Sequence, residues 1–137
     1  MTDSTTTITV GDAFPAVSIE PITRATLALF AGASGDHNPI HLDSDVAHAA
    51  GLDDVFAQGM LSMAYLGRAL TEWVPQSAIR EFSSRFTAIT PVHAQPTVSG
   101  TVIEIADVDG ARRLRIALSV MLQDGTQSLA GEALVDI

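Results

Sequence analysis

Three side chains that can hold or move a proton lie close together in the stretch Phe30 to Ala47. Asp36 carries a carboxylate, Asn38 an amide and His41 an imidazole. With ordinary pKa values of about 3.9 and 6.5, a carboxylate and an imidazole form a proton acceptor and donor pair near neutral pH. Chemistry that moves one proton off water and another onto carbon would need two such groups. Asn38 does not titrate, but its amide can orient either partner or bind water.

The backbone around these side chains is restricted. Gly35 can take the positive φ that reverses a chain without a Cβ clash, while Pro39 fixes its own φ and pushes Asn38 towards extended geometry. We therefore expect a stiff loop that holds Asp36 and His41 in place. Composition alone leaves an alternative open, because Ser, Gly, Asp, Asn and Pro are common turn residues and a neighbouring His can simply satisfy backbone groups.

The same stretch resembles the signature of the MaoC-like, (R)-specific enoyl-CoA hydratase family. The positions in register are Phe30, Ser34, Gly35, Asp36, Asn38, Pro39, Ile40, His41 and Ala47. Ala33 is smaller than the residue expected there, and His37 fills the variable position. So many fixed positions make the motif specific. The sequence that follows, RALTEWVPQSAIREFSSRFTAITPV, is similar to catalytic subunits of actinobacterial heterodimeric (3R)-hydroxyacyl dehydratases of fatty-acid elongation.

The resemblance implies a hydro-lyase that adds water to trans-2-enoyl thioesters or removes it from (R)-3-hydroxyacyl thioesters. Asp36 and His41 would hold the catalytic water, and Asn38 would orient the water or the pair. The resemblance implies no metal and no cofactor, since the substrate arrives as a CoA or acyl-carrier-protein thioester. It also implies a dimer, either of two identical chains or of this chain with another subunit of the same fold.

A second functional element is the helix start at Ala57 to Met60. Gly59 lets a ligand carbonyl approach its backbone N–H, and a helix N-terminus favours negative charge, so this N–H is the candidate oxyanion donor; close helix packing is the alternative. The resembling family usually opens this helix with His-Gly-Met, whereas this chain has Gln58. Secondary substrate-binding candidates are Gln58, Met60, Ser62 and Arg85. For Ser62, a hydrogen bond back to its own helix is the alternative.

Several elements must position these residues. Thr23 is the expected N-cap of a helix of about ten residues that ends near Gly32 or Gly35. A short helix is predicted over 45–50 and a long one over 59–73, apolar on nearly every side and so expected to be buried. A short strand and turn, broken by Gly11-Asp12, are predicted over 8–14, and a strand over 17–20. After the long helix, strands are predicted over 79–90, 97–106, 111–122 and 127–137, where two Asp-Gly pairs favour an antiparallel meander.

These elements predict an α+β fold, in which an antiparallel sheet wraps a long buried central helix. This is the hot-dog arrangement, which the family resemblance also implies. We expect one domain over residues 1–137, with residues 1–7 frayed. No apolar run of about 20 residues and no export leader is present, so we expect a cytoplasmic protein without a membrane partner.

Composition excludes several functions. The 137 residues carry a formal charge of −9, with seven Arg and no Lys, which argues against nucleic-acid binding and excludes a lysine Schiff base. The absence of Cys removes disulfides and thiol nucleophiles. His37, His41 and His48 lack the spacing of a zinc site, and His48 and His93 are expected to be surface residues.

Two alternative functions stay open at this stage. A hot-dog thioesterase would typically need a carboxylate on the central helix, where the first acid is Glu72. A non-catalytic acyl-thioester-binding subunit of a hetero-oligomeric dehydratase is compatible with Gln58, although binding alone does not require Asp36, Asn38 and His41. The sequence does not specify the acyl chain or its carrier.

Overall fold

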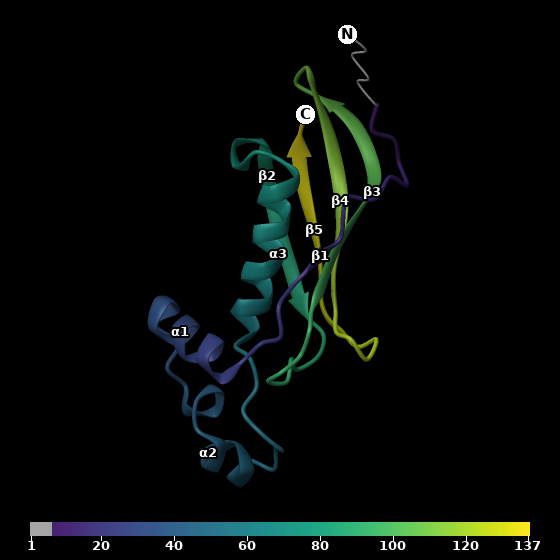
Figure 1. The fold of residues 1–137 in the computed structure, drawn as a ribbon. Helices are drawn as coiled ribbons and strands as arrows, with labels where there is room; N and C mark the ends of the chain where they lie inside the picture. The colour runs from purple at the N-terminus through teal and green to yellow at the C-terminus, as the bar shows by residue number, and fades with distance from the viewer. Residues whose placement is uncertain (1–6) are drawn as a thin grey trace.

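One antiparallel sheet of five strands lies along a long helix in the computed structural model, which describes residues 7–137 (Figure 1). The helices are α1 (Arg24–Ser34), α2 (Ser44–Ala49) and α3 (Gly59–Trp73), with short 3-10 turns η1 (Pro39–His41) and η2 (Gln76–Ala78). The strands are β1 (Val17–Ser18), β2 (Ile79–Phe86), β3 (Thr97–Val108), β4 (Ala111–Met121) and β5 (Gln127–Asp136). The predicted α+β hot-dog fold is confirmed. Apart from Thr7, the segment expected to be frayed lies outside the described residues.

The sheet has the order β1-β3-β4-β5-β2, and the predicted meander of the last three strands is confirmed. Asp109 and Gly110 both have positive φ and close the tight β3–β4 turn. The second Asp-Gly pair lies instead in a longer connection over 122–126. Two strand predictions were wrong in extent: β2 ends at Phe86 rather than residue 90, and β1 ends at Ser18 rather than residue 20. The turn predicted within 8–14 is present, but the short strand predicted there is reduced to one isolated bridge between Ala13 and Thr101.

Helix α3 begins and ends as predicted, but it is buried on one side only. Leu61, Leu66, Ala69 and Leu70 are buried, and the last three pack in the main core with residues of β3, β4 and β5. The opposite side, including Met60, is exposed in the single chain because no described element covers it. No helix in the described part of the chain is long and apolar enough to cross a membrane.

A second, smaller hydrophobic cluster joins the start of α3 to α1 and α2. Figure 1 shows these two helices at the end of the molecule where α3 begins. Its buried members are Ile22, Leu27, Ala47, Val55, Ala57, Leu61 and Val92. Helix α1 starts at the predicted cap, where Thr23 and Thr26 form a reciprocal capping box, and ends at Gly35 in the left-handed conformation with φ of 80°. This cluster positions the loop that follows α1.

Candidate active site

The loop after α1 is held by hydrogen bonds between its own side chains and backbone. Ser34 Oγ accepts from the Asp36 N–H at 3.2 Å, and Asp36 Oδ1 accepts from the Asn38 N–H at 3.3 Å. Asn38 Oδ1 in turn accepts from the Ile40 N–H at 3.2 Å and caps η1, the turn that contains His41. These local turns give the stiffness that Gly35 and Pro39 predict.

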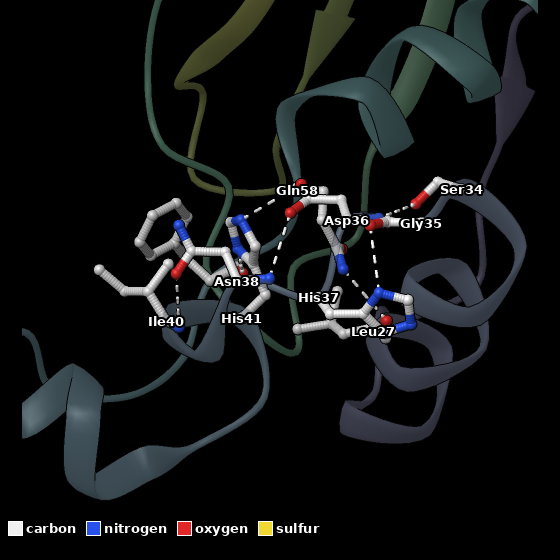
Figure 2. A network of polar contacts seen from close by, with 10 residues as sticks. Leu27, Ser34, Gly35, Asp36, His37, Asn38, Ile40, His41 and Gln58 are labelled. Carbon is white, nitrogen blue, oxygen red and sulfur yellow. Dashed lines mark hydrogen bonds and ion pairs between the residues drawn. The ribbon is translucent and has the colours of Figure 1, made fainter.

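The imidazole of His41 lies between Asp36 and the segment before α3 (Figure 2). Its Nδ1 lies 2.7 Å from the carbonyl oxygen of Phe56, and its Nε2 lies 3.7 Å from Asp36 Oδ2. A carbonyl only accepts, so Nδ1 carries the proton and donates it to Phe56. The His41 side chain is 9% exposed and that of Asp36 46%, so a nearly buried imidazole faces a carboxylate that solvent reaches.

Asn38 contacts the rest of the loop through both its side chain and its backbone. Its side-chain oxygen is engaged by the Ile40 N–H, while its backbone N–H holds Asp36 Oδ1. Asp36 Oδ2 is thereby left to face His41. Asn38 thus orients the Asp36–His41 pair through its backbone.

The segment that carries Phe56 is fixed by Asp54. This carboxylate accepts from the Val55 N–H at 2.8 Å and from the Ser44 hydroxyl at 3.4 Å, and it pairs with Arg24 of α1. The Val55 N–H bond, with the Arg24 charge and the hydrogen bonds from Ser44 and Arg24, holds the pKa of Asp54 below its ordinary value against the opposing effect of desolvation. The partner of His41 therefore comes from a segment tied to both α1 and α2.

A cavity of about 360 Å³ opens at the start of α3. Its lining is mostly apolar and includes Phe56, Gly59, Ser62, Phe86 and Thr90. The Gly59 N–H is the first of the helix, so no carbonyl of a preceding turn accepts from it. A Cβ at Gly59 would lie 3.1 Å from the Phe86 ring, so glycine keeps this end of the helix open.

Gln58 precedes the helix and is buried, with 1% of its surface exposed. Its Nε2 donates to the Leu27 carbonyl of α1 at 3.1 Å (Figure 2). Its Oε1 is buried and finds no hydrogen-bond partner among residues 7–137. The amide therefore links α3 to α1 through its nitrogen, and its oxygen is left without a hydrogen bond among the described residues.

The secondary candidates separate in space. Ser62 is buried, and its only side-chain hydrogen bond within the described residues is with Thr90, so the alternative bond to its own helix is not observed. Met60 is 55% exposed. Arg85 is exposed on β2, where strand alternation places it on the sheet face opposite Phe86.

The remaining chemical candidates do not join the site. His48 Nε2 donates to the Asp53 carbonyl at 2.8 Å, and His93 is an exposed loop residue with positive φ. Within the described range, no three or more His, Asp or Glu side chains gather in a metal-binding group. Glu72, the first acid of α3, lies at the far end of the helix and pairs with Arg68 at 3.3 Å.

Two contributors were not predicted, Phe56 and Thr90. Phe56 acts through its backbone carbonyl, which carries no sequence signal. Thr90 was assigned to a strand, but it lies in the irregular stretch after β2 and turns its hydroxyl to Ser62. The end of the strand alternation after Phe86 was the one signal that could have indicated a loop there.

Comparison with known families agrees with this geometry. A family model described as a MaoC like domain matches residues 5–120. The chain belongs to the MaoC-like dehydratase family. This membership confirms the resemblance seen in the signature and the predicted class of enzyme, a hydro-lyase. A comparison with curated protein sequences found no match.

Solved structures show the same fold across this family. The chain is 31% identical to the unliganded R-hydratase PhaJ1 from Pseudomonas aeruginosa, with a TM-score of 0.82 over 93% of this chain and 81% of that one. It is 20% identical to a chain of the ChsH1-ChsH2 complex from Mycobacterium tuberculosis, with a TM-score of 0.82 and coverage of 96% and 99%. The truncated HadBC (3R)-hydroxyacyl-ACP dehydratase complex from the same organism is 14% identical, with a TM-score of 0.71 and coverage of 96% and 98%. The last two likenesses show the fold alone.

Proposed function

We propose that this MaoC-like protein catalyses the reversible addition of water to a trans-2-enoyl thioester, giving an (R)-3-hydroxyacyl thioester. One observation carries the proposal. Asp36 Oδ2 and His41 Nε2 face each other at 3.7 Å, and His41 also contacts Phe56 at the wall of the cavity. The likeness to an R-hydratase at 31% identity supports the same reaction.

The protonation of His41 defines what the pair can do. Because Nδ1–H donates to Phe56, Nε2 of the neutral ring bears a lone pair, as does the facing carboxylate oxygen. Two acceptors 3.7 Å apart are too distant for a direct hydrogen bond but suit a water molecule that donates one O–H to each. The lone pairs of that water then point to the substrate.

The reaction balances with these groups alone. The water oxygen bonds to Cβ as the pair accepts one water proton, and the electrons of the double bond move through Cα to the thioester oxygen. The Gly59 N–H would bind this enolate-like oxygen, a contribution that is typically worth about a hundredfold in rate. A proton from the pair then goes to Cα on the same face. Both proton steps are therefore assigned to the Asp36–His41 pair as a whole.

The exposed surface supports a partner subunit. Met60, Phe86 and Ile89 are each more than half exposed, and β2 is an edge strand beside them. We propose that a second hot-dog subunit, identical or not, covers this surface. The complexes ChsH1-ChsH2 and HadBC have this fold, which supports the proposal. We further propose a cytoplasmic enzyme without metal or cofactor, acting on CoA or acyl-carrier-protein thioesters.

The test is the loss of enoyl absorbance when the purified protein meets trans-2-enoyl-CoA of short and medium chain length. We expect Asp36→Asn to lower kcat by roughly a hundredfold or more, because it removes a proton acceptor but keeps the shape. Asp43→Asn is the matched control, since Asp43 only caps α2 and Asn caps equally well.

Two outcomes would contradict the proposal. One is a wild-type protein that binds acyl-CoA but hydrates no chain length, which would favour a non-catalytic subunit. The other is release of free thiol without loss of the double bond, which would identify a thioesterase. Chiral analysis of the product checks the configuration, and an (S)-3-hydroxyacyl product would refute the (R) assignment.

A further inference from the structure

Buried polar side chains gather at one end of the molecule. Within residues 7–137 the buried polar or charged residues are His41, Gln58, Ser62, Thr90 and Ser128. The first two belong to the loop and helix start described above, and the other three line the cavity beside Gly59. Burying a hydroxyl costs free energy unless hydrogen bonds compensate for the lost water. Three hydroxyls in a mostly apolar cavity therefore require an explanation.

The hydroxyls of Ser62 and Thr90 have more O–H donors than hydrogen bonds to use them. Ser62 Oγ and Thr90 Oγ1 lie 3.4 Å apart, and this is the only side-chain hydrogen bond that either makes within the described residues. Each hydroxyl has one proton to donate, and one bond uses one proton. The pair therefore has one O–H donor left over, inside the cavity. Ser128 differs, because its proton is donated to the Val120 carbonyl.

The helix geometry places this spare donor next to Gly59. Gly59 and Ser62 are three residues apart on α3, so they share a helix face, and helical side chains lean towards the N-terminus. Thr90 is held independently, because its carbonyl accepts from the Ala57 N–H at 2.8 Å. The segment before α3 thus fixes the distance between Thr90 and the helix start.

We propose that the Ser62–Thr90 pair supplies a second hydrogen-bond donor to the thioester carbonyl oxygen, beside the Gly59 N–H. Ser62 is the residue that contacts the oxygen, and Thr90 positions the Ser62 hydroxyl. The inference rests on the proposed hydration and adds a requirement on how the substrate binds. The substrate must present its carbonyl oxygen to two donors at once, so the rate depends on both hydroxyls.

Steady-state kinetics with trans-2-enoyl-CoA provide the first test. We expect Ser62→Ala and Thr90→Val to lower kcat by roughly tenfold to a hundredfold, with KM changing much less, because the donor acts most strongly on the charge that develops in the transition state. Thr90→Ser keeps the hydroxyl and should retain most activity. Ser84→Ala is the matched control, because the Ser84 hydroxyl is also buried but lies on β2 outside this cavity. Unfolding curves of all variants show whether a loss comes from the fold.

A spectroscopic test separates contact with the carbonyl from a structural role. A conjugated dienoyl-CoA bound to the Asp36→Asn variant turns over much more slowly than on the wild type, so its absorbance can be recorded. Hydrogen bonds to its carbonyl oxygen shift this absorbance to longer wavelength. Adding Ser62→Ala should reduce this shift, whereas adding Ser84→Ala should not. An unchanged shift and unchanged kcat in Ser62→Ala, with an active wild type, would overturn this inference alone. A wild type inactive on every thioester would instead overturn the proposed function.

Discussion

Replacing Gln58 by Met should leave the fold equally stable or make it more stable. The substitution removes the bond from Nε2 to the Leu27 carbonyl, which is worth about 1 kcal/mol. It also removes the buried Oε1, which lacks a partner among residues 7–137 and whose desolvation costs about 1 to 3 kcal/mol. Leu27 lies within α1, so its carbonyl still accepts a backbone hydrogen bond within the helix after the substitution. The two contributions sum to between no change and a gain of about 2 kcal/mol.

The matched variant is Gln58→Glu, which keeps the shape but brings a carboxyl to a site that is 1% exposed. We expect it to cost about 3 kcal/mol or more near neutral pH, because a carboxylate is buried and an oxygen replaces the donor to Leu27. Burial raises the folded-state pKa of such a group, so the penalty should shrink as pH falls and the carboxyl becomes neutral. Urea unfolding at two pH values measures both effects. A loss of more than about 1 kcal/mol in Gln58→Met would show that Oε1 has a partner and would refute this reasoning.

Two further predictions concern the sheet. Gly100→Ala should destabilise the protein by roughly 1 to 3 kcal/mol, because the added Cβ would lie 2.7 Å from the Trp73 ring. Gly32→Ala in α1 is the control, because its added Cβ meets nothing within 4 Å and the change should be neutral or stabilising. Equal unfolding midpoints for the two variants would contradict this expectation. Asp136→Asn should destabilise at neutral pH but not at strongly acidic pH. Hydrogen bonds from Arg113 and then Arg80 hold the pKa of Asp136 far below its ordinary value, so its stabilisation is present above the unfolded-state pKa near 4 and is lost as pH falls through the folded-state pKa. Unfolding measurements on the wild type and the variant over a pH series test this. A difference in stability that stays constant with pH would contradict the ion-pair explanation.

Local sequence signals predicted the fold where the chain itself determines the structure. Thr23, Gly35 and the two Asp-Gly pairs act on their own neighbours, and the caps and turns lie where these residues place them. The helix over 59–73 could equally be predicted, from its apolar run and from Pro75 after it. The end of β2 was not, because the stretch 87–90 leaves the sheet to meet the segment before α3, a contact between residues about 30 positions apart such as Ala57 and Thr90.

The candidate site divides in the same way. The signature contains Asp36, Asn38 and His41, and their proximity follows from one short loop. The partner of His41 is a backbone carbonyl, and the spare hydroxyl of Ser62 depends on a residue 28 positions away. Residue types do not reveal such contributions, because every residue has a backbone carbonyl and the role of a serine depends on its neighbours in the fold.

The division of the hydrophobic residues into two clusters makes activity and global stability separable quantities. The main cluster joins α3 to the sheet, whereas the smaller one carries α1, α2 and the Asp36–His41 loop and shares Leu61 with the start of α3. A cluster of this size opens at lower free energy than the whole domain. Heat or denaturant would then separate the Asp36–His41 pair from the start of α3 while the sheet is still folded. The protein would then lose activity before its sheet and central helix unfold.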